Sequence, residues 1–291
     1  MDPAHSIDLV SCPAREQCAE LALVLESQAV PSIVRWDGRA WVLSVDAADA
    51  AFARRQLSAY AAESKRTAQS KPELKGIGNP WPGIFFYLIT IIGFALIAPE
   101  LVFGIEWLAR GRMDAGMMFA GEWWRPVTAL SLHADAAHLL GNAFFGSLFA
   151  YSVARYWGGG FGWLAIVLCG TFGNVANGFL SGADHRSIGA STAVFAALGL
   201  LAAYCWRRGF PAFASARERS APIVAGIGLL AYMGTGGVNT DIGAHLLGFV
   251  VGFGGGLLGA RFGVPTGRRA QISSGLAAGA IFAAAWLAAV L

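Results

Sequence analysis

The strongest constraint on this chain is a series of apolar runs that begins near residue 82 and continues to residue 291. A helix needs about 20 apolar residues to cross the hydrocarbon core of a bilayer, with a range of about 17–25. Seven runs approach this length, and the first and fifth are the shortest: 83–98, 136–154, 161–180, 188–206, 223–237, 242–260 and 275–291. Only 13% of the residues are charged, whereas soluble proteins average about 25%. The sequence therefore predicts an all-α polytopic membrane protein.

The N-terminal part has a different character and predicts a small soluble α/β domain. Helical periodicity covers about residues 13–28, and two β-rich runs follow, joined through Asp37-Gly38, a pair typical of a hairpin turn. A second helix is expected to end near Glu63. The predicted organisation is a cytosolic α/β domain at 1–63, a basic polar linker at 64–81, a six-helix membrane core at 82–261, and a loop with a seventh transmembrane helix at 262–291.

Basic residues indicate the orientation, because cytoplasmic loops carry an excess of Lys and Arg. Four basic residues lie in the linker, four arginines lie in the connection 207–221, and three more follow the sixth run. A cytoplasmic N-terminus places all of these on one side. The bias is not absolute, because four arginines fall on the other side: Arg110, Arg112, Arg125 and Arg186. We expect a multi-pass protein of the inner (plasma) membrane with a cytoplasmic N-terminus.

Two reactive side chains, Ser191 and His245, lie within these runs, where polar groups are costly and usually functional. Both the fourth and the sixth run are expected to enter from the outer face. At a rise of about 1.5 Å per residue, both side chains would lie within about two turns of that face. Because histidine can accept the serine proton, the pair predicts a nucleophile and a base near the periplasmic surface. Either residue taken alone would also suit a packing role.

Small residues surround both positions. Gly189 and Ala190 precede Ser191 and leave room for a substrate backbone. Gly248 belongs to a stripe of small residues at a spacing of four that borders His245. Such stripes allow membrane helices to approach closely. We therefore expect the fourth and sixth helices to pack against each other.

His138 and Asn142 are four residues apart at the start of the second run, so they share one helical face. Both can donate hydrogen bonds, as an oxyanion in a low-dielectric site requires. A zinc protease helix would need Glu beside the first His and a second His four residues later; Leu139 and Asn142 occupy those places, so no metal is expected. The alternative is a polar pair that bonds one helix to another.

Four motifs together carry a family resemblance: EWWRP at 122–126, HLLGN at 138–142, GAST at 189–192 and AHLLG at 244–248. The region 83–260 resembles the rhomboid intramembrane serine proteases. The resemblance implies a six-helix core, here with a seventh helix, and a Ser191–His245 dyad without an acid. His138, Asn142 and the Ser191 backbone N–H would be the oxyanion donors. Trp124 and Arg125 match a motif that is structural in the family.

The sequence departs from the family pattern at three positions. Thr192 stands where Gly usually follows the nucleophile, Phe195 stands where a Tyr often packs on the histidine ring, and Ala154 replaces a common Glu. The first two affect the expected substrate preference and rate. No departure removes a group that the chemistry needs.

The expected partners are transmembrane protein substrates that enter sideways from the lipid, and the membrane lipids themselves. A net charge of +3, dispersed along the chain, does not favour nucleic acid. No cofactor is expected. Two other classes stay open: a non-catalytic rhomboid-like protein that binds membrane clients, and a proton-coupled transporter that uses His138 and His245.

Other polar residues are expected to have structural roles. Asp241 is expected to cap the sixth helix, although a triad with His245 is an alternative. His133 and His185 are expected to be solvated or interfacial. Asn174 and Asn177 are expected to bond between helices, or else to line a water path to the site.

Overall fold

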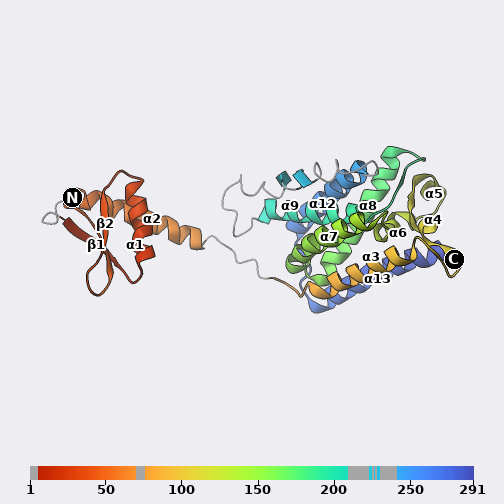
Figure 1. The fold of residues 1–291 in the computed structure, drawn as a ribbon, viewed down its shortest axis with the longest axis horizontal. Coiled ribbons are helices and arrows are strands. Elements are labelled where there is room, and N and C mark those ends of the chain that lie inside the picture. Colours follow the sequence, from red (N-terminus) through yellow and green to blue (C-terminus); the bar gives the residue numbers. More distant parts are fainter. Residues whose placement is uncertain (1–5, 70–75, 209–222, 225, 227, 230–240) are drawn as a thin grey trace. The chain divides into compact units, whose positions relative to one another are not determined.

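A computed structural model describes residues 6–69, 76–208, 223–224, 226, 228–229 and 241–291 (Figure 1). The predicted fifth run, 223–237, lies outside the described residues apart from isolated positions. The chain divides into two compact units, Met1–Glu73 and Leu74–Leu291.

The first unit contains a three-stranded antiparallel sheet and two helices. The sheet has the order β1-β3-β2, with β1 at Ser6–Cys12, β2 at Ser32–Trp36 and β3 at Trp41–Asp46. The Asp37 carboxylate accepts the N–H groups of Arg39 and Ala40, which closes the turn between β2 and β3. The helices are α1 (Arg15–Glu26) and α2 (Ala50–Gln69), and α1 contributes the buried Cys18 and Leu25 to a core with Leu43 and Val45.

Two features of this unit differ from the sequence expectation. The strand β1 was not predicted, because its partner β3 is distant in the chain: Ser6 pairs with Asp46 and Cys12 with Trp41. The helix α2 continues to Gln69, into the predicted linker. No Gly or Pro interrupts the sequence between Glu63 and Gln69, so nothing local ends the helix there.

The second unit is helical. Its long helices are α3 (Trp81–Ile97), α7 (Ala136–Trp157), α8 (Gly159–Ser181), α9 (Ser191–Arg208), α12 (Ile242–Phe262) and α13 (Arg268–Val290). By length and composition, α8, α12 and α13 can each cross a membrane, while α3 and α9 are apolar but shorter. The helix α7 has 22 residues and includes polar residues such as His138, Asn142 and Arg155. These bounds follow the predicted runs closely except in α13.

The helix α13 begins at Arg268 rather than near residue 275. Hydrogen bonds to a distant segment stabilise its polar first turns, and the sequence alone does not reveal them. The Gln271 Oε1 accepts the N–H groups of Gly160 and Phe161, and its Nε2 donates to the Trp157 carbonyl. These bonds tie the start of α13 to the turn between α7 and α8.

The connection between α3 and α7 is folded rather than open. It contains the short elements β4 (Leu101–Val102), β5 (Ile105–Glu106), α4 (Trp107–Gly111), β6 (Met113–Asp114), α5 (Ala115–Phe119), α6 (Arg125–Thr128) and the 3-10 turn η2 (Ala129–Ser131). The strand β6 pairs with β7 (Arg186–Ser187), which lies just before α9. The Arg186 Nε also donates to Asp114 Oδ2 at 2.8 Å. The segment that leads into Ser191 is therefore attached to this connection.

The helices α9 and α12 lie side by side with their backbones in close contact (Figure 1). A Cβ built on Gly248 would lie 2.3 Å from the Thr192 carbonyl oxygen, and a Cβ on Gly252 would lie 2.1 Å from that of Ala196. Each step of four residues along α12 matches a step of four along α9, so the two helices are parallel. The stripe of small residues therefore packs directly on the helix that begins at Ser191.

Replacing Gly252 by leucine is expected to force these helices apart, because backbone atoms occupy the space that a side chain would need. Overpacking of this kind costs about 1–3 kcal/mol, and thermal unfolding in detergent would measure the loss. The matched control is Gly254→Leu, two residues along the same helix, where a Cβ would meet nothing within 4 Å. Equal unfolding temperatures for the two variants would contradict the close packing.

Candidate active site

Ser191 is the first residue of α9 and is only 5% exposed. The preceding Gly189 has φ +137°, a conformation that side-chain-bearing residues rarely adopt, and its N–H donates to the Ala129 carbonyl at 3.0 Å. A Cβ on Gly189 would lie 2.8 Å from His138 Nε2 and 3.4 Å from Ser191 Oγ. A side chain at residue 189 would thus meet both the His138 imidazole and the serine hydroxyl, and the site requires glycine here for both conformation and space.

His245 lies one turn into α12 and is 4% exposed. The Phe195 ring stacks on its imidazole, with centroids 4.6 Å apart and an interplanar angle of 24°. The His245 Nδ1 is buried without a hydrogen-bond partner. The structure brings Ser191 and His245 to the same end of two packed helices, but among the described residues no hydrogen bond joins them.

Asn142 is fully buried on α7, and neither atom of its side-chain amide has a hydrogen-bond partner. Its backbone carbonyl accepts a hydrogen bond from the Tyr87 hydroxyl at 2.7 Å. The backbone of Asn142 is therefore hydrogen-bonded to α3, whereas its side-chain amide is not bonded. A buried unsatisfied polar group costs about 1–3 kcal/mol, and folded proteins keep few of them without a reason. His138, one turn earlier on the same face, contacts the Gly189–Ser191 segment. Both candidate hydrogen-bond donors therefore lie on α7, and His138 is the one beside Ser191.

His133 was expected to be solvated or interfacial, and its ring nitrogens are shielded from solvent. Both of its ring nitrogens are buried without partners, and its ring lies edge-on to His138 with centroids 5.2 Å apart. Burial away from water, together with the neighbouring His138 ring, lowers the pKa of His133 to about 4, so this imidazole is neutral near pH 7. The fold of the segment before α7 buries the ring against the site.

Arg125 has a structural environment. Its side chain is buried, pairs with the Glu122 carboxylate, and donates from one nitrogen to the carbonyls of Ala109 at 3.0 Å and Arg112 at 2.9 Å. Trp124 is partly buried against the cluster that contains Leu132 and Trp286. The guanidinium therefore organises the connection between α3 and α7, and none of the partners described for it is Ser191.

A polar network that the sequence analysis missed lies at the start of α12. Asp241 caps this helix as expected, with its Oδ1 accepting the Ala244 N–H at 3.0 Å. Its Oδ2 accepts the Asn177 amide at 2.8 Å and lies 3.0 Å from His185 Nε2. The His185 side chain is only 16% exposed, so of the two expected placements, solvated or interfacial, the solvated one is wrong. The network connects α8, the segment before Ser191 and the helix of His245.

Asn174 and Asn177 both bond between elements, as the sequence suggested. The Asn174 amide donates to the Pro126 carbonyl at 2.8 Å and so connects α8 to α6. The spacing of these asparagines on an apolar helix was the available signal for interhelical bonding, but their partners are distant in the chain. Among the residues that the structure describes, no group of three or more metal-ligating side chains is found.

The fold and this site define a multi-pass α-helical membrane protein with a cluster of reactive polar side chains between its helices. Residues 120–262 match the family model of the Rhomboid domain. In Bacillus subtilis (strain 168), the "Putative rhomboid protease YdcA" is 32% identical over 133 residues, which cover 46% of this chain and 65% of that protein. The rhomboid protease GluP of the same organism is 32% identical over 118 residues, 40% of this chain and 22% of that protein. These matches support a rhomboid family protein, and the chain spans less than two thirds of the length of either relative.

Proposed function

We propose that this protein is an intramembrane serine protease in which Ser191 is the nucleophile and His245 is the general base. The observation that carries the proposal is the backbone contact between α9 and α12, which places two buried reactive side chains at the facing starts of parallel helices. The relatives named as rhomboid proteases add support from outside the structure.

The reaction follows from these groups. The Ser191 Oγ attacks the scissile carbonyl carbon while its proton passes to the His245 imidazole. The resulting oxyanion accepts hydrogen bonds from His138, from Asn142 and from the Ser191 N–H, which has no intrahelical acceptor in the first turn of α9. The C–N bond then breaks, and His245 returns the proton to the leaving amine. Water, deprotonated by the same imidazole, attacks the acyl-enzyme; the bond between the acyl carbon and Ser191 Oγ then breaks, and His245 gives its proton to the departing Oγ. The carboxylic acid product ionises to a carboxylate.

The proposed substrates are single-span membrane proteins that enter from the lipid. A helical peptide bond is hydrogen-bonded and shielded, so the substrate must unwind locally before Ser191 can reach its carbonyl. Segments with small or helix-breaking residues near the scissile bond meet this need.

The proposed orientation puts the site near the periplasmic face. Ser191, His245 and His138 lie at the starts of α9, α12 and α7, whereas Arg155 and Arg261 lie at the ends of α7 and α12. The bias of basic residues toward the cytoplasm supports a cytoplasmic N-terminus.

A fluorophosphonate probe, which reacts with activated serines, tests the proposal directly. We expect labelling of the wild-type protein, measured by in-gel fluorescence or by intact mass, and no labelling of His245→Ala. A non-catalytic member of the family would leave the wild type unlabelled, and this outcome would reject the dyad. The matched control is Ser147→Ala, because Ser147 is also on a membrane helix with an unpartnered hydroxyl, and this variant should label like the wild type.

A further inference from the structure

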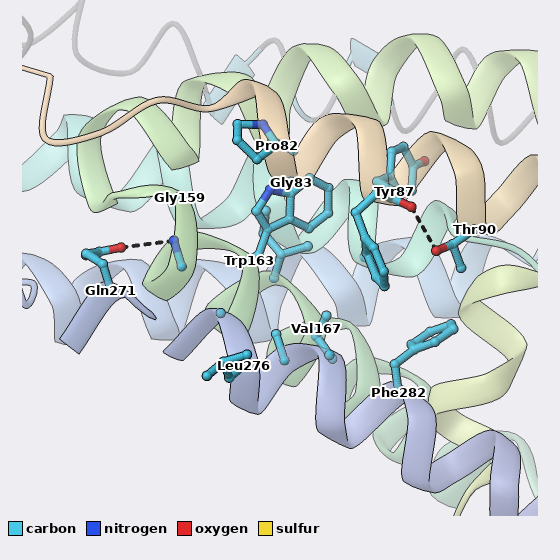
Figure 2. Close-up of a pocket in the computed structure, with 18 of the residues that line it drawn as sticks. Pro82, Gly83, Tyr87, Thr90, Gly159, Trp163, Val167, Gln271, Leu276 and Phe282 are labelled. Carbon is cyan, nitrogen blue, oxygen red and sulfur yellow. Dashed lines mark hydrogen bonds between the residues drawn. The ribbon is translucent and has the colours of Figure 1, made fainter. Parts of the chain in front are cut away.

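A cavity of about 870 Å³ lies between α3, α8 and α13, and its inner wall reaches the start of α9. Its walls are largely apolar and include Phe86, Trp163, Val167, Leu276 and Phe282, as Figure 2 shows in part. Its volume falls within the range of about 300–1,000 Å³ that is typical of small-molecule pockets. An apolar space of this size in a membrane protein loses many dispersion contacts unless something fills it.

The cavity exists because α3 and α13 do not pack closely along their middle sections. A Cβ built on Gly279 of α13 or on Gly93 of α3 would meet nothing within 4 Å. A second apolar space of about 450 Å³ shares Gly279 with the first and continues along both helices. Its lining includes Phe94 and Trp286, whose rings stack with centroids 4.3 Å apart. The two spaces adjoin along α3 and α13 and are together called the apolar channel below.

One end of the cavity is polar and carries positive charge. Asn79, Thr266, Arg268 and Gln271 line this end, and Figure 2 shows Gln271 beside the start of α8. Arg268 is exposed, and no described carboxylate forms an ion pair with it. Arg155 lies beside Gly76, next to the segment that lines this end. An unpaired cation at the mouth of an apolar channel is complementary to an anionic headgroup that carries an acyl chain.

We propose that an anionic phospholipid from the bilayer occupies this cavity, with its phosphate at Arg268 and an acyl chain between α3 and α13. The basic end is the cytoplasmic end in the proposed orientation, where anionic lipids bind basic pockets between helices. The inner wall includes Leu130 and Ala190, so the acyl chain would pack beneath the residue that precedes Ser191.

Native mass spectrometry of the full chain tests this proposal without relying on proteolysis. The protein is delipidated in detergent and titrated with dioleoyl phosphatidylglycerol or with dioleoyl phosphatidylcholine, which differ only in the headgroup. We expect one tightly retained phosphatidylglycerol per chain, and at least about fivefold weaker retention of phosphatidylcholine, the difference that one basic residue near an anionic headgroup supplies. Arg268→Gln should reduce phosphatidylglycerol retention to the phosphatidylcholine level. Gly279→Leu fills the channel and should reduce the retention of both lipids.

The controls separate the cavity from general effects on the protein. Arg269→Gln removes a neighbouring charge that does not line the cavity, and Gly254→Leu adds an equivalent side chain to an open position on α12. Both should retain lipid like the wild type, with unchanged unfolding temperatures in all four variants. Equal retention of the two lipids by the wild type would overturn the proposal. Unchanged retention of phosphatidylglycerol in both Arg268→Gln and Gly279→Leu would also overturn it. A stable dimer that retains no lipid would do the same.

Discussion

Ser191→Ala is expected to abolish cleavage of a model transmembrane substrate while leaving the protein folded. The substitution removes the proposed nucleophile, and no other group in the site can form the acyl-enzyme. Loss of the nucleophile in a serine protease lowers kcat by about 10⁶-fold, which places the residual rate below detection. Cleavage is measured in proteoliposomes by the appearance of the two product fragments.

The stability of this variant is expected to match that of the wild type. Alanine keeps the Cβ of Ser191, and among the described hydrogen bonds none involves the Ser191 hydroxyl, so no buried partner is left unsatisfied. Ser147→Ala provides the matched control and should cleave normally. Retained cleavage in Ser191→Ala would remove this residue from catalysis and with it the proposed mechanism.

Asn142→Ala is expected to lower kcat by about 10²-fold with little change in KM, because an oxyanion donor acts mainly in the transition state. The amide of Asn142 is fully buried and has no hydrogen-bond partner in the resting protein. Its removal therefore leaves no other group unpaired, and we expect no loss of thermal stability. If Asn142 is an oxyanion donor, the Asn142→Ala variant is therefore slower than the wild type but equally stable.

Asn174→Ala is the matched control for this prediction. Asn174 is also a buried asparagine on a membrane helix, but its amide donates to the Pro126 carbonyl. This variant should lose stability, because the carbonyl would lose its partner. An unchanged rate in Asn142→Ala, or a fall in its unfolding temperature like that of Asn174→Ala, would remove Asn142 from the proposed oxyanion role and indicate a structural one.

The sequence was informative wherever the controlling property is local. Hydropathy and small-residue spacing were enough to predict α8, α12 and the glycine stripe of α12, because lipid exposure and close helix approach depend on which residues recur along one segment. The cap at Asp241 was predictable for the same reason, since it needs only the next three residues. The proposed site residues were also selected from local motifs.

The partners of these residues depend on contacts between distant segments. No local pattern shows that His133 is buried against His138, that His185 meets Asp241, or that Gln271 holds the start of α13. The cavity between α3 and α13 is likewise invisible in either helix alone, because it arises from how far apart two packed helices lie. Hydrophobic periodicity identifies which face of a helix is buried, but not which neighbour covers it or how closely. That information resides in the packing of the whole chain.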